Sequence, residues 1–438
     1  MSSFPKDLSL LNEKYRMFRT LTGGEKTGNH KFIFSAEDCF AAEGTETCCG
    51  SRILEGYRPP FDATSVSGMK EAGGLLIGKT NMDEFGLGNF SVNSAFGVPK
   101  NPYDPNRTCG GSAGGAACAA ALIDGQISIG VSSGGSVCLP ASFCGVYGFV
   151  PTYGRISRYG TIGCSSSLDK VGVFSADASD LRKYVTIMSG KDAKDPASCI
   201  QPELKDGTVR KIAVPEDADR GVSPAVKKAF SESTEKLKDM GITVERIEMP
   251  FAEYAVPACH VIVAAEASAS LACYCGMRYG RQDGDLTLKF DDYFTSFRSE
   301  YFGEETKRTI LLGTLAGMSG YRERYYTKAK MVRQNVIDGY RSVFEKYDAI
   351  LTPTVPFVPP EFGKISEMTP TETYRAETFA CPPDLAGIPH MSVPCGYDGD
   401  GMPIGVQFAS AHWNEDALFS LAEEWKKNFD MIKPEAEP

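Results

Sequence analysis

The chain of 438 residues has few histidines and no C-x-x-C motif. Its four histidines are His30, His260, His390 and His412. None lies near a serine-rich stretch, so the usual imidazole base of a serine hydrolase is not evident. Fourteen cysteines are present but scattered, which leaves a zinc ribbon or a thioredoxin motif without support. Histidine-dependent and zinc-dependent chemistry are therefore not the first expectation.

The chain also has no net positive charge and no long apolar stretch. The net charge of −10 argues against a broad electrostatic contact with nucleic acid, so a partner subunit would hold any nucleic acid substrate. No apolar run approaches the roughly 18 residues of a membrane span, and the first residues do not resemble a secretion signal. We expect a cytoplasmic chain, without a membrane segment, whose cysteines are free buried thiols.

Helix-like and strand-like stretches alternate along the chain, a pattern typical of α/β architecture. Residues 73–78 read as a short buried strand that ends at Lys79. Residues 114–122 are small and apolar and predict a helix packed closely on a sheet. Residues 127–131 read as another strand, which leads into a glycine-rich loop.

Later stretches predict further elements of the same kind. A three-and-four apolar spacing predicts a long helix over 321–346, and residues 348–353 and 404–408 read as strands. If these strands join the early ones in one sheet, the chain is a single domain over residues 1–438. Residues 362–383 lack periodicity and are expected to form either a surface loop or a loop bordering an active site.

Two serines in glycine-rich loops and one lysine form the main candidate site. Ser112 lies in 109–115 and Ser136 in 132–137, while Lys79 ends the early strand. A serine hydroxyl needs a base, and burial can lower the pKa of a lysine enough for it to serve. Ser112 could then relay the proton between Ser136 and Lys79.

Ser136 is the better nucleophile candidate because Ser133, Gly134 and Gly135 precede it. Adjacent glycines allow backbone N–H groups to converge on an oxyanion. Each well-placed donor stabilises the transition state by roughly 3 kcal/mol. One alternative remains open. Residues 110–114 match the G-x-S-x-G nucleophile elbow, which would make Ser112 the nucleophile with a base such as His390 or His412. A phosphate-binding loop is not supported, because the sequence lacks the G-x-x-x-x-G-K-[ST] pattern of such loops.

These loops resemble the amidase signature family, and the likeness extends over roughly residues 30 to 425. Within that family, the likeness is greatest to the branch linked to tRNA. Besides the serine loops, it is carried by residues 61–64, 78–85, 93–97, 140–145, 151–160, 166–169, 265–268, 278–280, 312–313, 320–321, 325–330, 385–389 and 392–396. The resemblance implies a large central mixed β-sheet flanked by helices on both faces. It also implies a catalytic core at about 60–180 and a helical substrate-binding region at about 250–390.

Carried over residue by residue, the resemblance implies Ser136 as the acylated nucleophile, Lys79 as the base and Ser112 as a bridging serine held by a cis peptide bond. Backbone amides from Ser133 to Ser136, those of Gly134 and Gly135 included, would form the oxyanion hole. In the tRNA-linked branch an arginine and an acid bind the charged ends of glutamine. Here Arg308 and Glu377 match those positions.

The sequence departs from the family pattern at several points. The loop usually written Asp-Thr-Gly-Gly-Ser-Ile-Arg has Ser132 and Cys138 in place of its two charged residues. Both members of a probable ion pair are therefore absent, and no single buried charge is left without its partner. Ala113 replaces a second serine, Cys259-His260 replaces a tyrosine pair, and the usual Lys-Asp of the first strand reads Glu37-Asp38.

The function that the resemblance implies is a glutaminase subunit of an aminoacyl-tRNA amidotransferase. Ammonia would pass to a B subunit, where ATP and Mg²⁺ activate Glu-tRNA(Gln) or Asp-tRNA(Asn), with a small C subunit clamping the pair. The tRNA would be held mainly by the partner, and this chain would need no cofactor or metal. Two alternatives stay open: a free-standing amidase for another small amide, and a non-catalytic scaffold.

Overall fold

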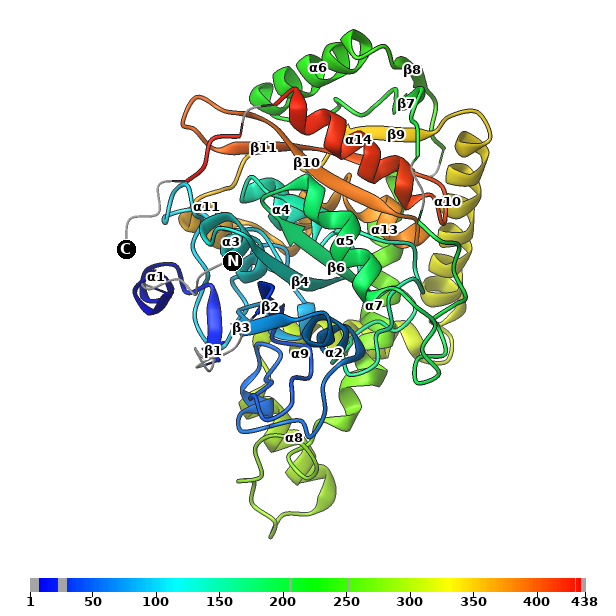
Figure 1. Cartoon of the computed structure of the whole chain (residues 1–438). Helices are drawn as coiled ribbons and strands as arrows, with labels where there is room; N and C mark the ends of the chain where they lie inside the picture. The colour runs from blue at the N-terminus through cyan, green and yellow to red at the C-terminus, as the bar shows by residue number, and fades with distance from the viewer. Residues whose placement is uncertain (1–7, 23–29, 205–206, 251, 430, 435–438) are drawn as a thin grey trace.

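The computed structural model describes residues 8–22, 30–204, 207–250, 252–429 and 431–434 (Figure 1). Eleven strands join into one mixed sheet in the order β1-β3-β2-β4-β6-β5-β10-β11-β9-β7-β8. The predicted late strands therefore lie in the same sheet as the early ones. The strands are β1 Phe18–Leu21, β2 Phe32–Glu37, β3 Gly74–Thr80, β4 Gln126–Ser132, β5 Tyr147–Val150, β6 Lys170–Ser175, β7 Lys211–Pro215, β8 Thr243–Ile247, β9 Ala349–Pro353, β10 His390–Tyr397 and β11 Pro403–Ala409.

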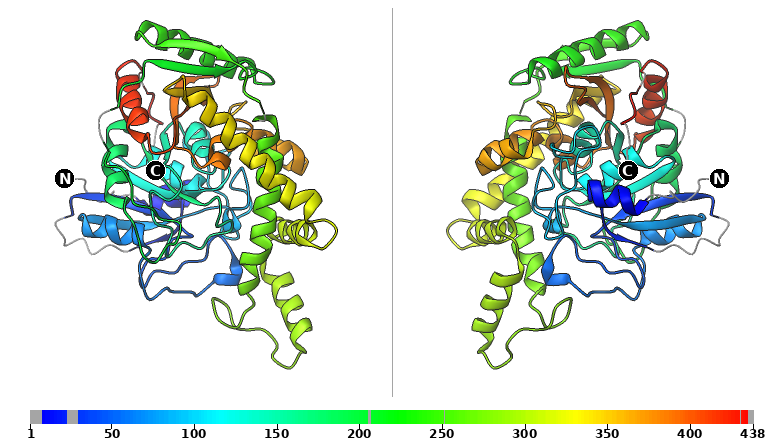
Figure 2. Two further views of the ribbon diagram at one scale, coloured as in Figure 1. Left: turned by 90° about the vertical axis from the view of Figure 1, so that its right-hand side faces the viewer. Right: turned by 90° about the vertical axis from the view of Figure 1, so that its left-hand side faces the viewer.

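Helices cover both faces of this sheet (Figures 1 and 2), which confirms the predicted fold class. The α-helices are α1 Leu8–Tyr15, α2 Thr64–Glu71, α3 Gly114–Leu122, α4 Cys138–Phe143, α5 Ala178–Met188, α6 Pro224–Asp239, α7 Ala255–Ser270, α8 Phe290–Tyr301, α9 Glu304–Gly317, α10 Lys328–Phe344, α11 Phe362–Glu367, α12 Pro370–Thr373, α13 Cys381–Ala386 and α14 Glu415–Lys427. Short turns of other helix types are η1 Arg52–Leu54, η2 Glu84–Gly86, η3 Ala252–Tyr254, η4 Leu271–Cys273, η5 Glu323–Thr327 and η6 Tyr374–Glu377.

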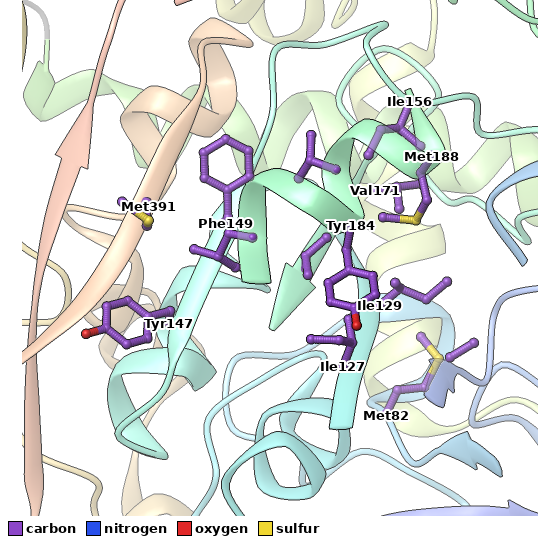
Figure 3. Packing of buried hydrophobic residues seen from close by; sticks show 14 of the residues in the cluster. Met82, Ile127, Ile129, Tyr147, Phe149, Ile156, Val171, Tyr184, Met188 and Met391 are labelled. Atoms are coloured by element: carbon purple, nitrogen blue, oxygen red, sulfur yellow. The ribbon is translucent and has the colours of Figure 1, made fainter. Parts of the chain in front are cut away.

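The two faces of the sheet bury different helices. One face packs against α2, α5, α6 and α14, and part of this core is seen in Figure 3, where Tyr184 of α5 lies over Ile127 and Ile129 of β4. The other face packs against α3 and α4 near β2 to β6, and against α7, α10 and α13 near β7 to β9. Alternating side chains on each strand supply the two cores.

The helix α3 shows why the sequence folds as predicted at this point. Its residues are alanine, glycine and cysteine for seven consecutive positions, all buried, and their small side chains let the helix lie close to the sheet. A Cβ added at Gly115 would lie 2.4 Å from the carbonyl oxygen of Asn81. This close approach fixes the start of α3, and therefore the loop that carries Ser112.

The segment 362–383 is not a loop, although the sequence suggested one. It folds into α11, α12, η6 and the start of α13, and several of its residues border a large cavity. A capping box at Thr369 and Glu372 starts α12, and prolines lie in the first turn of both α12 and α13. Local capping therefore supplies order where hydrophobic periodicity is absent.

One helical stretch, Ala252–Cys273, is long and apolar enough to cross a membrane by length and composition, which the sequence analysis did not anticipate. Within the fold it packs against α9, α10 and α13, and part of it borders the cavity. These contacts place it within the folded domain, although only 33% of its most apolar 18-residue window is buried.

Candidate active site

A cavity of about 930 Å³ lies between the serine loops, α7, α9 and the 362–378 segment. Ser112, Ser133, Gly134 and Ser136 all line it. Ser112 is buried and Ser136 is partly buried, and both hydroxyl-bearing loops meet at the wall of this cavity.

Backbone hydrogen bonds join the Ser112 loop to the Ser136 loop and to Asp83. The N–H of Ala113 donates to the carbonyl oxygen of Ser136 at 3.4 Å, and the N–H of Asp83 donates to the carbonyl oxygen of Ser112 at 3.2 Å. The peptide bond between Gly111 and Ser112 is cis, as the family resemblance implied.

The expected position of Lys79 beside the serines is wrong. Its ammonium donates to the carbonyl oxygen of Phe40 at 2.5 Å and to the hydroxyl of Thr47 at 3.1 Å, and it lies 3.6 Å from the carboxylate of Asp38. Lys79 is fully buried but does not line the cavity, and within the described ranges it has no hydrogen bond to Ser112 or Ser136. Burial lowers its pKa, as expected, while Asp38 opposes that shift.

Sheet register explains this placement. Lys79 of β3 pairs with Ala36 of β2, whereas Glu37 pairs with Thr80. Paired residues share a face, so Lys79 and Glu37 point to opposite faces of the sheet. Glu37 shares its face with Ile33, which packs in the same core cluster as Ala113 beside Ser112. The group that β2 and β3 present on the serine side is therefore the carboxyl of Glu37.

Glu37 lines the cavity together with both serines, although its side chain is buried. Its Oε2 accepts the N–H of Val131 at 2.7 Å, and its Oε1 is buried without a hydrogen-bond partner among the described residues. Burial raises the pKa of Glu37 to about 8, against the opposing effect of the Val131 N–H. The site thus holds a carboxyl that changes its charge near neutral pH.

A buried ion pair elsewhere holds the loop of Ser136 in place. Asp384 of α13 contacts Lys170 of β6 at 2.5 Å, and it also accepts the N–H of Gly135 at 2.6 Å and the hydroxyl of Ser132. Burial alone would raise the pKa of Asp384, but Lys170 and His390 hold it below its usual value. The loop that lacks charges at Ser132 and Cys138 is thus held by the Asp384–Lys170 pair.

This contact also changes the expected oxyanion hole. The N–H of Gly135 is taken by Asp384, so it is not free to meet a substrate. In the described part of the chain, the N–H groups of Ser133, Gly134 and Ser136 donate to no protein acceptor. These three remain the candidate oxyanion donors, while the prediction for Gly135 is wrong in this conformation.

Arg308 and Glu377 both line the cavity. Arg308 pairs with Glu305 at 2.5 Å and donates to the hydroxyl of Tyr374 at 2.7 Å. Glu377 lies 2.6 Å from Nε2 of His260, and the His260 ring stacks on Tyr374 with centroids 3.7 Å apart. Tyr374 therefore links a positive and a negative group on one wall.

The other histidines do not support the nucleophile-elbow alternative. His390 is buried, its Nδ1 lies 2.9 Å from the carbonyl oxygen of Ile388, and neither His390 nor His412 lines the cavity that holds Ser112. All fourteen cysteines are free, and no group of three or more His, Cys, Asp or Glu in the described part could hold a metal.

Sequence patterns did not place four residues beside the serine loops or the cavity charges: Asp384, Lys170, His260 and Glu37. The exchange of the usual Lys-Asp for Glu37-Asp38 was a visible signal for Glu37, because it changed a charge at the end of a strand beside the serines. Asp384 lies 249 residues from Gly135, and no spacing in the sequence pointed to that contact.

Comparisons with known proteins identify the family of this chain. The family model described as Amidase matches residues 33–419. The A subunit of glutamyl-tRNA(Gln) amidotransferase from Halothermothrix orenii is 38% identical over 442 residues, which cover 96% of this chain and 91% of that protein. An A subunit of the same enzyme from Clostridium acetobutylicum is 40% identical over 90% of this chain and 82% of its own length.

Solved structures show the same fold. The A subunit of glutamyl-tRNA(Gln) amidotransferase from Thermotoga maritima matches with a TM-score of 0.83 and 33% identity, covering 99% of this chain and 94% of that one. A 6-aminohexanoate cyclic dimer hydrolase matches with a TM-score of 0.81 at 21% identity, covering 98% of this chain and 93% of that one, a likeness of fold alone.

Proposed function

We propose that this chain, which belongs to the amidase family, is the glutaminase subunit of an aminoacyl-tRNA amidotransferase. The observation that carries the proposal is a single cavity lined by both serines and by two opposite charges, Arg308 and Glu377. A zwitterionic amide such as glutamine fits that combination, since each end meets a charge of opposite sign.

In this function Ser136 attacks the side-chain carboxamide of glutamine. The N–H groups of Ser133, Gly134 and Ser136 stabilise the oxyanion, and Ser112 passes protons to and from Ser136. Ammonia leaves, and water then hydrolyses the acyl-enzyme to glutamate. The core at about 60–180 supplies the serines, and the region at about 250–390 supplies Arg308 and Glu377.

The names of the relatives support an assembly with other subunits. We propose that a B subunit receives the ammonia and uses ATP and Mg²⁺ to amidate Glu-tRNA(Gln) or Asp-tRNA(Asn). A small C subunit completes the complex, the B subunit holds most of the tRNA, and the complex works in the cytoplasm. No cofactor is needed in this chain.

A second candidate function is a scaffold that holds its partners without hydrolysis. It is favoured by one observation: within the described ranges, no amine lies beside Ser112 or Ser136. A family member without a working base would keep its shape and its partners while losing turnover.

Ammonia release from glutamine separates these possibilities. The wild-type chain, co-expressed with a B subunit, is expected to release ammonia, and Ser136→Ala is expected to abolish the release. Asparagine and simple aliphatic amides serve as matched substrates for the free-standing amidase alternative. If wild type and Ser136→Ala release ammonia at the same rate, the hydrolytic proposal is wrong. If neither releases any, the scaffold is favoured.

A further inference from the structure

We propose that the carboxylate of Glu37 accepts the proton that Ser136 loses, acting through Ser112, in place of the amine expected at Lys79. The inference rests on the proposed function, because it assigns a residue to the serine-dependent hydrolysis. In this proposal Glu37 is a positioning and proton-accepting residue, because the relay reaches the reacting atoms through Ser112.

The placement of Glu37 supports this role. It ends β2 on the serine side of the sheet and lines the same cavity as Ser112 and Ser136. Its neighbour across the sheet is Gly130, where an added Cβ would lie 3.1 Å from Cβ of Ala113 and 3.3 Å from Oε2 of Glu37. Because Gly130 has no side chain, the Glu37 carboxyl and Ala113, the residue after Ser112, can lie close to each other.

Other candidate bases around the cavity are already engaged. Asp169 accepts the hydroxyl of Ser133 at 2.6 Å and two backbone N–H groups, and Glu377 is paired with His260. Among the described buried carboxyls that line the cavity, Glu37 alone has a buried oxygen without a partner, its Oε1. A buried oxygen without a hydrogen bond is costly, and the proposal assigns the Ser112 hydroxyl as its donor during the reaction.

The proton transfers balance without an external reagent. As Oγ of Ser136 bonds to the carboxamide carbon, its proton moves to Oγ of Ser112, and the proton of Ser112 moves to the carboxylate of Glu37. The protonated Glu37 then returns a proton through Ser112 to the leaving nitrogen, the C–N bond breaks and ammonia departs. Water attacks the ester in the same way, and the proton from water restores Ser136.

Glu37 must be ionised to accept a proton, so the rate should depend on its charge. Burial raises the pKa of its carboxyl to about 8; the Val131 N–H and the Cys39 thiol oppose this effect, and nearby Asp83 and Asp38 add to it. Asp169 lines the same cavity, and Lys79 faces the other side of the sheet. Hydrolysis should therefore increase as the pH is raised through about 8.

The test compares Glu37→Gln with wild type, using glutamine hydrolysis by the full chain alone and with a co-expressed B subunit. We expect kcat/KM to fall about 100-fold or more, with little change in KM, because general-base catalysis is typically worth that much. The pH-dependent increase of the wild-type rate should disappear in the variant. Glu84→Gln is the matched control: Glu84 is also a buried glutamate with a raised pKa, but it lies outside the cavity lining.

The outcomes are distinct. If wild type hydrolyses glutamine and Glu37→Gln keeps its rate and pH profile, the role of Glu37 is refuted while the proposed function stands. If wild type binds glutamine by calorimetry but releases no ammonia at any pH from about 6 to 9, spanning the raised pKa, both are refuted. If Glu37→Gln does not fold, the wild-type pH profile decides: a flat profile through about pH 8 contradicts the inference.

Discussion

At the residue scale, the identity of the base depends on which face of the sheet a side chain occupies. The pairing of β2 with β3 shifts between Phe34 and Ser35, where β3 has one extra residue, Ile77. A shift of one residue moves every following side chain of that strand to the opposite face. No pattern in the sequence predicted this bulge, so the sequence could not tell which face of the sheet Lys79 occupies.

The structural role of Lys79 leads to a prediction about Lys79→Met. The change removes the cation that Asp38 faces at 3.6 Å and leaves that buried carboxylate with Arg19 at 3.7 Å. We expect the free energy of unfolding to fall by about 3 kcal/mol or more, measured by urea denaturation. The folded fraction should keep its kcat within about threefold.

The double variant Lys79→Met/Asp38→Asn is the control, because it removes both charges together. It should recover part of the lost stability. A well-folded Lys79→Met protein that loses its activity would contradict this account and restore Lys79 as the base.

At the scale of single elements, local signals predicted the regular parts well. The small residues of α3 predicted its bounds of Gly114–Leu122, and the apolar spacing over 321–346 predicted the helix α10, which runs from Lys328 to Phe344. The serine loops themselves were found from their glycines. The contacts that hold those loops come from distant elements, such as Asp384 on α13, and single-sequence reasoning has no access to them.

The link between α13 and the Ser136 loop carries a prediction. Asp384→Ala leaves Lys170 buried without its partner and frees the N–H of Gly135. We expect a loss of about 3–5 kcal/mol in the free energy of unfolding, with a fall in the rate of acylation as the loop loses its anchor. Thermal and urea denaturation measure the first effect, and single-turnover kinetics measure the second.

Glu424→Ala is the matched control for that experiment, because Glu424 forms an exposed pair with Lys427 at 2.7 Å. It should cost less than about 1 kcal/mol. Equal losses in the two variants would mean that the Asp384–Lys170 pair does not anchor the loop.

At the scale of the whole molecule, the cavity joins parts that are far apart in the chain. The serine loops come from the first half of the chain, whereas Arg308 lies in α9 and Glu377 in η6, both in the second half. The sequence provided the list of these residues through family resemblance. The structure adds that Glu305, His260 and Tyr374 already contact the two charges, so substrate must compete with or join these partners.

This arrangement predicts the effect of Arg308→Ala on glutamine recognition. Loss of a charge-assisted contact to the substrate carboxylate should raise KM for glutamine about 10- to 100-fold, with a smaller effect on kcat. Lys307→Ala on the same helix is the control, because Lys307 pairs with the exposed Glu304 and does not line the cavity. An unchanged KM in Arg308→Ala would remove Arg308 from the substrate site.

The most direct test of hydrolysis in this cavity is to trap the acyl-enzyme. Wild-type protein, mixed with glutamine and quenched in acid, would be digested and the peptides compared by mass spectrometry. The account predicts a glutamyl ester on the peptide that contains Ser136, and none on that peptide from Ser136→Ala. An ester found on Ser112 instead, or ammonia released with no ester on either serine, would contradict it.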